Sequence, residues 1–221
     1  MDIKQKKIDY NVINEETKEN LLNEINNHLL LDDKPSNYFY SIIDTPIFKE
    51  YPFSMLYKTR ETEQSPVHHP EGNVWNHIML VVDQAARLKN KSKNEKVFMW
   101  AALLHDIGKP DTTRNKKGKI TSYDHEKVGA ALAREFLSEF TTDKNFIELV
   151  VGLIRWHMQI LHVVRNLPFA DIESMKEETD IKEIALLGYC DRLGRLKVDV
   201  VKEKENINLF LKKCKQCVKN A

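Results

Sequence analysis

Apolar residues recur along most of this chain at intervals of three and four positions rather than two. The 221 residues include only seven glycines and seven prolines, so few positions interrupt the pattern. A spacing of three and four places apolar side chains on one face of an α-helix, whereas a half-buried strand requires strict alternation. The pattern therefore predicts an all-α fold, in which amphipathic helices pack around a shared core.

The expected helices follow from where each apolar stripe begins and ends. The clearest stripes cover 74–88 and 97–104, and the second stops before Gly108 and Pro110. Further helices are expected over approximately 15–30, 124–140, 143–157, 184–191 and 201–218. The stretch 110–119 is polar and basic, and we expect it to form a flexible loop.

The domain organisation is expected to be simple, because no internal repeat or low-complexity linker divides the chain. Residues 66–200 carry the regular stripes and form the expected main domain. Residues 1–65 are less regular and aromatic, and we interpret them as an N-terminal helical cap packed on the same core. Residues 201–221 are interpreted as a C-terminal helix of that domain.

Composition narrows the class of protein. The hydrophobic fraction is 42%, the charged fraction 30% and the formal net charge +1, as in an ordinary soluble protein, so any nucleic-acid contact must come from a local patch. No apolar run was found that approaches the roughly 20 residues of a membrane span, and the polar start lacks a signal-peptide core. With three cysteines, these features predict a cytoplasmic protein with no membrane partner.

Five residues of metal-ligand type interrupt the apolar stripes: His77, His105, Asp106, His125 and Asp191. A carboxylate or imidazole among leucines and valines loses hydration worth several kcal/mol. A divalent cation shared between such groups is one of the few arrangements that offsets this loss. The stripes therefore predict a metal site between helices.

The core ligand set is expected to be His77, His105, Asp106 and Asp191. A single inward histidine is more often a hydrogen-bonded core residue than a ligand. The set as a whole favours a metal, because neither carboxylate has an obvious lysine or arginine on its own stripe, and unpaired buried carboxylates are rare. Mixed imidazole and carboxylate ligands suit Mn, Fe, Co, Ni, Zn or Mg, so the identity of the metal stays open.

Two further histidines, His125 and His157, also lie on inward positions. They could bind a second ion, or they could hydrogen-bond a substrate phosphate beside a single metal, and we favour the second role. Lys109 and Arg195 are expected to contact phosphate oxygens, because they lie next to the ligand positions. Asp106 could also orient the attacking water.

The segment 74–195 resembles the HD superfamily of metal-dependent phosphohydrolases, which is named for its His-Asp doublet. After His77, the motifs that carry the resemblance occur in the family's order: LLHDIGKP, YDHEKVGA, RWH and CDRLGR. The resemblance implies a helical fold with His77, His105, Asp106 and Asp191 as metal ligands. It also implies that His125 and His157 serve a second metal or the substrate.

Residues 34–195 more narrowly resemble the HD region of bacterial tRNA nucleotidyltransferases, which add CCA to tRNA ends. The segments that carry this likeness are KPSNYFYSII, HHPEGNVWNHIMLVVDQAA, HDIGKP and DRLGR. Those enzymes also have an N-terminal nucleotidyltransferase domain, and nothing in this chain corresponds to it, so CCA addition is not expected. The resemblance implies instead the hydrolysis of phosphomonoesters and 2′,3′-cyclic phosphodiesters.

Together these observations predict a metal-dependent phosphohydrolase that acts on nucleotides or RNA ends, with a metal-bound hydroxide as the nucleophile. A 5′-nucleotidase or nucleotide pyrophosphohydrolase is the nearest alternative within enzymes. A non-catalytic RNA-binding module is the alternative from another class, since the basic stretch 110–119 could contact RNA. The oligomeric state stays open.

Overall fold

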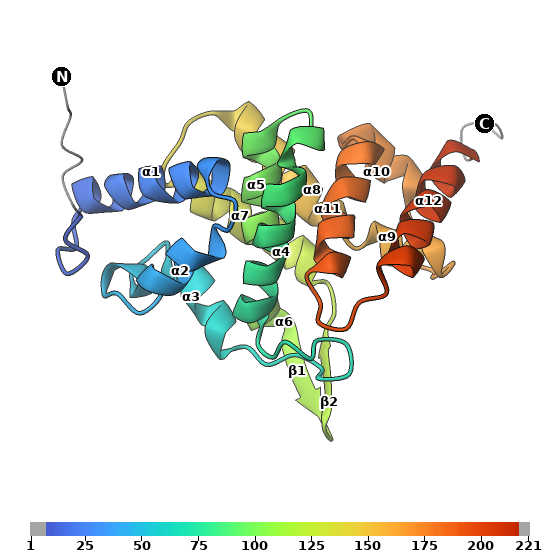
Figure 1. The fold of residues 1–221 in the computed structure, drawn as a ribbon, viewed down its shortest axis with the longest axis horizontal. Helices are drawn as coiled ribbons and strands as arrows, with labels where there is room; N and C mark the ends of the chain where they lie inside the picture. The colour runs from blue at the N-terminus through green and yellow to red at the C-terminus, as the bar shows by residue number, and fades with distance from the viewer. Residues whose placement is uncertain (1–7, 217–221) are drawn as a thin grey trace.

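A computed structural model describes residues 8–216, and nearly all of its regular structure is helical (Figure 1). This arrangement confirms the all-α prediction. In chain order the elements are α1 (Glu15–Leu31), α2 (Ser36–Ile42), η1 (Ile47–Lys49), α3 (Ser54–Tyr57), η2 (Lys58–Glu61), α4 (Val74–Leu88), η3 (Lys89–Lys91), α5 (Glu95–Leu104), α6 (Lys109–Thr112), β1 (Thr113–Lys116), β2 (Lys119–Ser122), α7 (His125–Ser138), α8 (Lys144–Trp156), α9 (Gln159–Val164), α10 (Ile172–Glu178), α11 (Ile181–Leu193) and α12 (Val200–Gln216).

Side-chain caps explain why the longer helices begin where they do. The side chains of Asn14, Asn73, Asn94 and Asp143 each accept a hydrogen bond from a backbone N–H in the first turn of α1, α4, α5 and α8. For most of the helices expected from the sequence, the first and last residues in the structure lie within two positions of the expected range. The expected end of the last helix at position 218 lies outside the described residues, and α9 and α10 were not expected.

The main core lies between α4, α5, α8 and α11, which Figure 1 shows at the centre of the molecule. Helix α7 packs on α8, and α12 packs on α11 and α9. In α12, Phe210 is fully buried, while Ile207 and Leu211 are partly buried against the core. The four central helices therefore enclose the space in which the predicted ligands meet.

The first part of the chain contacts the bundle through α1 on α5 and α2 on α4. An aromatic cluster joins the two regions, since the Trp75 ring of α4 lies edge-on to Phe39 and Phe48, with centroids 6.1 and 6.0 Å away. Such buried aromatic pairs fix the cap segment on α4, close to His77. Residues 1–7 of the expected cap and 217–221 of the expected C-terminal helix lie outside the described residues.

The expectation of a flexible loop over 110–119 was wrong. A short helix, α6, leads into an antiparallel hairpin of β1 and β2, in which Lys116 pairs with Lys119. Lys117 and Gly118 both adopt positive φ angles, 52° and 81°. Two such residues form a hairpin turn whose twist matches the right-handed twist of the flanking strands. The strands are only four residues long, so their alternation is too brief to recognise in the sequence.

One apolar stretch was also missed. Lys144–Val164, which covers α8 and α9, is 21 residues long and apolar enough by length and composition to cross a membrane. More than half of it is buried inside the protein, mainly against α7 and α5. This burial is what a core helix requires, and it gives the apolar composition a structural cause.

Candidate metal centre

Six predicted residues meet where five helices end or cross. His77 lies in α4 and Asp191 in α11, His125 is the first residue of α7, and His157 directly follows α8. The His105-Asp106 doublet was expected on a helix face, but α5 ends at Leu104, so the doublet lies on the turn that follows. His105 directly follows α5 and keeps helical φ and ψ angles of −56° and −33°, and the side chains of both doublet residues belong to one cluster.

Two glycines allow the ligand-bearing segments to approach closely. A Cβ atom on Gly108 would lie 2.2 Å from the carbonyl oxygen of His125 and 2.4 Å from the nitrogen of Gly129. A Cβ atom on Gly194 would lie 2.5 Å from Cγ2 of Val81 in α4. Because Gly108 has no side chain, the His105-Asp106 turn can pack directly on α7. Because Gly194 has none, the end of α11 can pack directly on α4.

The first group of ligand-type atoms contains the four predicted core ligands. Nε2 of His77 lies 3.0 Å from Oδ1 of Asp191 and 3.7 Å from Oδ2 of Asp106. Nε2 of His105 lies 3.3 Å from the same Asp106 oxygen. His77, His105 and Asp106 each present an atom within 4.8 Å of the other two, which suits coordination of a single cation.

A second group shares Asp106 with the first. Oδ1 of Asp106 lies 3.3 Å from Nε2 of His125 and 3.9 Å from Nε2 of His157, and the two imidazole nitrogens are 3.3 Å apart. These three residues also each present a ligand atom within 4.8 Å of the other two. Because each carboxylate oxygen of Asp106 faces a different group, this aspartate would serve as a ligand for a cation held by either group.

Backbone carbonyl groups fix the protonation of three of these rings. Nδ1 of His105, His125 and His157 lies 2.9, 2.7 and 2.7 Å from the carbonyl oxygens of Ala102, Ser122 and Ile154. A carbonyl oxygen only accepts hydrogen bonds, so each Nδ1 must carry the proton. In the neutral rings Nε2 then has a free lone pair directed at the cluster, as in metal-ligating histidines.

Glu71 performs the same function for the fourth ring. Its Oε1 accepts hydrogen bonds from Nδ1 of His77 at 3.0 Å and from Nδ1 of His69 at 2.8 Å. The Glu71 side chain is only 2% exposed, so this carboxylate is held in place by the two imidazoles. The sequence placed Glu71 either near the entrance of the site or in a structural role at the start of the helix, and it did not predict the contact with His77, which depends on the turn before α4 folding back on the helix.

Lys109 and Arg195 contradict one premise of the sequence argument, namely that the two carboxylates lack cationic partners. Nζ of Lys109 lies 2.7 Å from Oδ2 of Asp106, and Nη2 of Arg195 lies 3.3 Å from Oδ1 of Asp191. Lys109 follows Asp106 by three residues, and Arg195 follows Asp191 by four. This spacing places each cation on the same side of a helical turn as its carboxylate. Both also line the cavity described below.

Burial and charge set the protonation of the cluster. Burial alone raises the pKa of Asp106, but the charge of Lys109 and the contacts with His105 hold that pKa well below its usual range. Arg195 and His77 do the same for Asp191. Burial lowers the pKa of His125 to about 3 and also lowers that of His157, so both rings are neutral at pH 7.

His77 differs from the other rings. Burial lowers its pKa, but the hydrogen bonds to Asp191 and Glu71 outweigh burial and raise it. A proton on Nε2 of His77 therefore faces the carboxylates of Asp106 and Asp191, where a cation would otherwise bind. Proton and cation compete for the same lone pair.

The residues present fit a divalent metal. Nε2 of His105 is buried without a hydrogen-bond partner. Nε2 of His125 faces Nε2 of His157 although each ring carries its proton on Nδ1, so two lone pairs point at each other. Buried unpaired polar atoms are rare in proteins, and a cation bound by these nitrogens and by Asp106 satisfies all of them.

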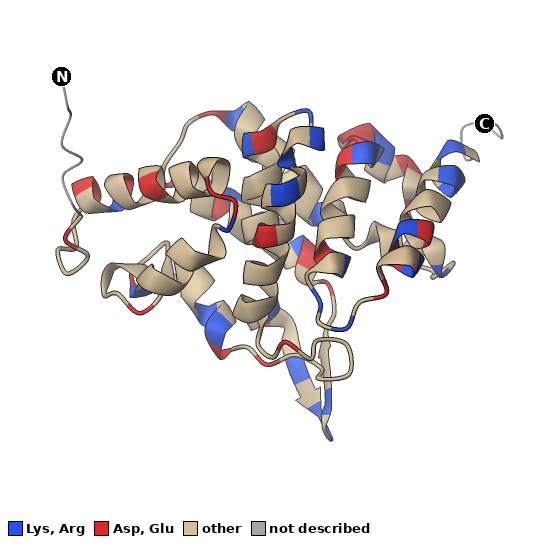
Figure 2. Cartoon of the chain, viewed as in Figure 1, with Lys and Arg blue, Asp and Glu red and all other residues tan. Residues whose placement is uncertain are grey.

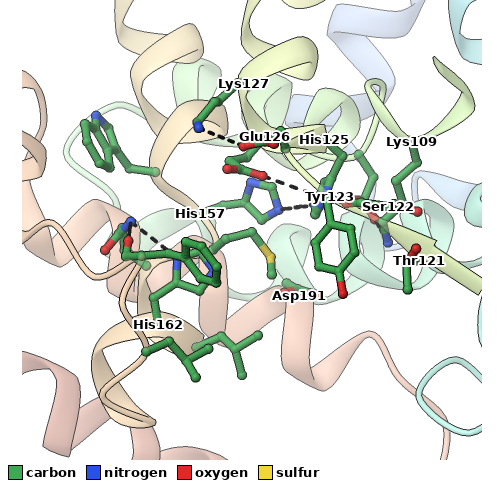
Figure 3. Close-up of a pocket in the computed structure, with 18 of the residues that line it drawn as sticks. Lys109, Thr121, Ser122, Tyr123, His125, Glu126, Lys127, His157, His162 and Asp191 are labelled. Carbon is green, nitrogen blue, oxygen red and sulfur yellow. Dashed lines mark hydrogen bonds and ion pairs between the residues drawn. The ribbon is translucent and has the colours of Figure 1, made fainter. Parts of the chain in front are cut away.

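The cluster lies at the base of a cavity of about 940 Å³ (Figure 3). Asp106, His125, His157 and Asp191 line it, with Lys109 and Arg195 beside them. Figure 3 shows the pair His125 and His157 with Tyr123, Ser122 and Thr121 from the end of the hairpin. The structure thus brings the predicted residues together, with His77 and His105 buried outside the cavity lining, and their individual roles stay predictions.

Comparison with known proteins agrees with this geometry. Residues 74–195 match the HD domain family. A multifunctional CCA protein of Actinobacillus pleuropneumoniae serotype 5b (strain L20) is 30% identical over 129 residues, which is 57% of this chain and 30% of the relative. The multifunctional CCA protein of Aromatoleum aromaticum is 37% identical over 117 residues, or 53% of this chain and 27% of the relative.

A third relative, the multifunctional CCA protein of Methylococcus capsulatus, is 27% identical over 172 residues, covering 76% of this chain and 34% of the relative. The chain therefore spans about a third or less of the length of these relatives. The family match covers more than half of the chain and contains all six clustered histidines and aspartates. This chain belongs to the HD domain family.

Proposed function

We propose that the protein is a metal-dependent phosphohydrolase that cleaves phosphomonoesters or 2′,3′-cyclic phosphodiesters of nucleotides or RNA ends. The observation that carries the proposal is the convergence of imidazole Nε2 atoms and two carboxylates at the base of the cavity. HD domains are generally metal-dependent hydrolases, which supports the reaction class. The CCA relatives support a nucleotide or RNA substrate.

A bound divalent cation would lower the pKa of water and polarise the phosphoryl oxygens. Four residues, His77, His105, Asp106 and Asp191, are proposed to hold it. The low pKa of both carboxylates keeps them ionised at neutral pH, as ligands must be.

For His125 and His157, the hydrogen bonds favour a second cation over the phosphate contact that the sequence favoured. A neutral ring whose Nδ1 donates to a carbonyl oxygen has no proton on Nε2 to donate to a phosphate. Their lowered pKa values keep both rings neutral. Both, together with Asp106, would therefore hold a second cation.

Lys109 and Arg195 are proposed to bind the phosphoryl oxygens. Both line the cavity, and the Nε atom of Arg195 is buried without a hydrogen-bond partner. Nζ of Lys109 is held by Asp106 and by Oε1 of Gln64 at 2.6 Å. In this role the two side chains would offset the negative charge that builds on the phosphoryl oxygens during attack at phosphorus.

The hairpin of β1 and β2 is proposed to contact the RNA backbone. It projects from the body of the molecule, and Lys and Arg positions occur along both of its strands (Figure 2). Arg114, Lys116, Lys117 and Lys119 are exposed, and its second strand leads directly into the cavity lining. Exposed cations in a row bind phosphates without sequence preference.

A substrate panel tests the proposed activity. Purified protein is incubated with Mn²⁺, Ni²⁺, Co²⁺ or Mg²⁺ and with adenosine 2′,3′-cyclic phosphate, adenosine 2′-phosphate, adenosine 5′-phosphate or a nucleoside triphosphate. We expect hydrolysis of the 2′,3′-cyclic phosphate or the 2′-phosphate. We expect this activity to be lost in His77→Ala and Asp191→Ala. Cleavage of the 5′-phosphate or the triphosphate alone would instead identify a 5′-nucleotidase or a pyrophosphohydrolase. If every substrate stayed intact with every metal, the proposal would be wrong.

A further inference from the structure

The cavity is larger than its metal-binding base requires. Its volume of about 940 Å³ lies near the upper end of the roughly 300–1,000 Å³ typical of sites that enclose a whole small molecule. A phosphoryl group beside Asp106 and His157 would fill only the inner part. The outer part must therefore contact the remainder of the substrate.

Aromatic side chains form much of this outer part. Tyr123, which precedes α7, is 71% exposed, and Phe169, which follows α9, is 63% exposed, yet both line the cavity. The ring of His162 in α9 lies with its centroid 5.7 Å from that of Phe169, tilted by 57°. In Figure 3, Tyr123 and His162 project toward the cavity from different sides, with His157 deeper in the site.

The segment that carries Phe169 is held by a buried side chain. Gln159 is only 4% exposed, and its Nε2 donates to the carbonyl oxygen of Phe169 at 3.1 Å while its Oε1 accepts from the backbone nitrogen of Asp171 at 3.0 Å. The backbone nitrogen of Leu167 also donates to the carbonyl oxygen of His162 at 2.9 Å. Phe169 is thus presented on a braced turn, although its ring is exposed.

The surroundings indicate which flat group this wall would accept. Lys127 and Arg155 line the same cavity, so the aromatic rings are flanked by polar and charged groups rather than by a continuous apolar surface. Both side chains are paired, Lys127 with Asp124 at 2.7 Å and Arg155 with Glu126 at 4.0 Å, and a lipid chain lying there would cover these ion pairs without hydrogen-bonding to them. A nucleobase has a flat face for stacking and polar edges for hydrogen bonds, and base–aromatic stacking tolerates any base.

We propose that Tyr123, His162 and Phe169 form a nucleobase subsite, which the protein uses to recognise nucleotides over phosphate esters that lack a base. The proposal rests on the proposed function, because it assumes that the phosphoryl group binds at the metal centre. It assigns the two exposed rings a role in specificity rather than in the reaction itself.

The kinetic test compares two cyclic phosphates. Adenosine 2′,3′-cyclic phosphate carries a base, and glycerol 1,2-cyclic phosphate has the same reactive ring without one. We expect Phe169→Ala and Tyr123→Ala each to raise KM for the adenosine ester about tenfold, within the range of a lost stacking contact, and to leave hydrolysis of the glycerol ester unchanged. Phe169→Tyr should retain the wild-type KM, and Tyr40→Ala, an exposed aromatic outside the cavity, is the matched control.

A binding measurement separates this proposal from the proposed function. Titration calorimetry with adenosine 5′-phosphate and with inorganic phosphate, both in the presence of Mn²⁺, requires no turnover. The subsite predicts tighter binding of the nucleotide than of phosphate, and a loss of that difference in Phe169→Ala, even if no ester is hydrolysed. Equal binding of the nucleotide by wild type and both alanine variants would overturn the subsite, while leaving any hydrolysis of the glycerol ester intact.

Discussion

At the scale of single residues, the candidate centre depends on where each imidazole proton is held. Three histidines direct Nδ1 to a backbone carbonyl, whereas His77 directs it to the carboxylate of Glu71. A carboxylate partner raises the basicity of the ring and fixes its orientation more strongly than a carbonyl does. Glu71 is therefore the residue outside the cluster on which the first metal position should depend most.

Glu71→Gln tests this dependence. The amide keeps an acceptor oxygen near His77 and His69 but removes the negative charge, so we expect Mn²⁺ affinity to fall about 10- to 100-fold, as is usual for a lost carboxylate partner of a ligating histidine. Titration calorimetry measures the affinity. Glu63→Gln is the matched control, because Glu63 is exposed. Unchanged affinity in Glu71→Gln would show that His77 does not depend on this carboxylate.

The sequence predicted the clustered residues well and their partners poorly. His77, His105, Asp106 and Asp191 were recognisable because ionisable residues stood within apolar stripes or in a known motif. Glu71 lies before the helix that carries His77, and only the folded turn brings the two together. Its role depends on a three-dimensional contact that spacing along one helix does not encode.

At the scale of elements, the centre requires the doublet turn to touch α7. The close approach occurs where Gly108 faces the backbone of His125 and Gly129. A methyl group there would meet backbone atoms, which cannot move aside as a flexible side chain does. The two metal positions are therefore linked to the packing of two segments.

Gly108→Ala should separate those segments. We expect a loss of about 1–3 kcal/mol of unfolding free energy, typical of overpacking, together with weaker Mn²⁺ binding. Urea unfolding followed by circular dichroism measures the first effect and calorimetry the second. Gly152→Ala is the control, since a Cβ atom there would make only an ordinary contact 3.6 Å from Oγ1 of Thr179. Equal stability of the two variants would contradict the packing argument.

The hairpin makes a separate prediction about RNA. If its lysines bind phosphates, Lys116→Ala with Lys119→Ala should weaken binding of a short single-stranded RNA and lower its salt dependence by about 0.7 per lost contact, on a log–log scale. Fluorescence anisotropy at several salt concentrations gives this slope. Lys202→Ala with Lys204→Ala removes the same charge from exposed positions in α12. Identical slopes for both double variants would exclude the hairpin as the contact.

Long amphipathic helices were predictable from the sequence, whereas short elements were not. Helices α4 and α8 carry enough turns for an apolar stripe to be recognised and a polar cap to be placed. Strands β1 and β2 have four residues each, and their pairing depends on the two positive φ angles at the turn. The same Lys-Gly pair is compatible with an open loop, so local sequence alone could not distinguish the two.

At the scale of the whole molecule, buried histidines make the stability of the metal-free protein depend on pH. Burial lowers the pKa of His125 to about 3 and that of His69 to about 4, from an ordinary value of 6.5. Below pH 6.5 the unfolded chain therefore binds protons that the folded protein excludes. The pKa of His77 is raised, so above pH 6.5 the folded protein holds a proton that the unfolded chain has released. The stabilisation from that proton is lost as the pH rises through the raised pKa.

We therefore expect the unfolding free energy in EDTA to be greatest near pH 6.5 and to fall on acidification toward pH 4.5. The fall should reach at most about 1.4 kcal/mol per pH unit for each excluded proton. Urea unfolding at a series of pH values measures the profile, and His125→Gln should make its acid side less steep. A profile that is flat between pH 6.5 and 4.5 would contradict the burial of neutral histidines.

The central claim is that His77, His105, Asp106 and Asp191 bind a divalent cation at the base of the cavity. Titration of the metal-free protein with Mn²⁺ at pH 7.5, read by calorimetry, tests it most directly. We predict that wild type binds at least one equivalent and that Asp106→Asn, which alters the residue common to both groups, binds at least tenfold more weakly while remaining folded. No binding to wild type, or equal binding by both proteins, would contradict the claim.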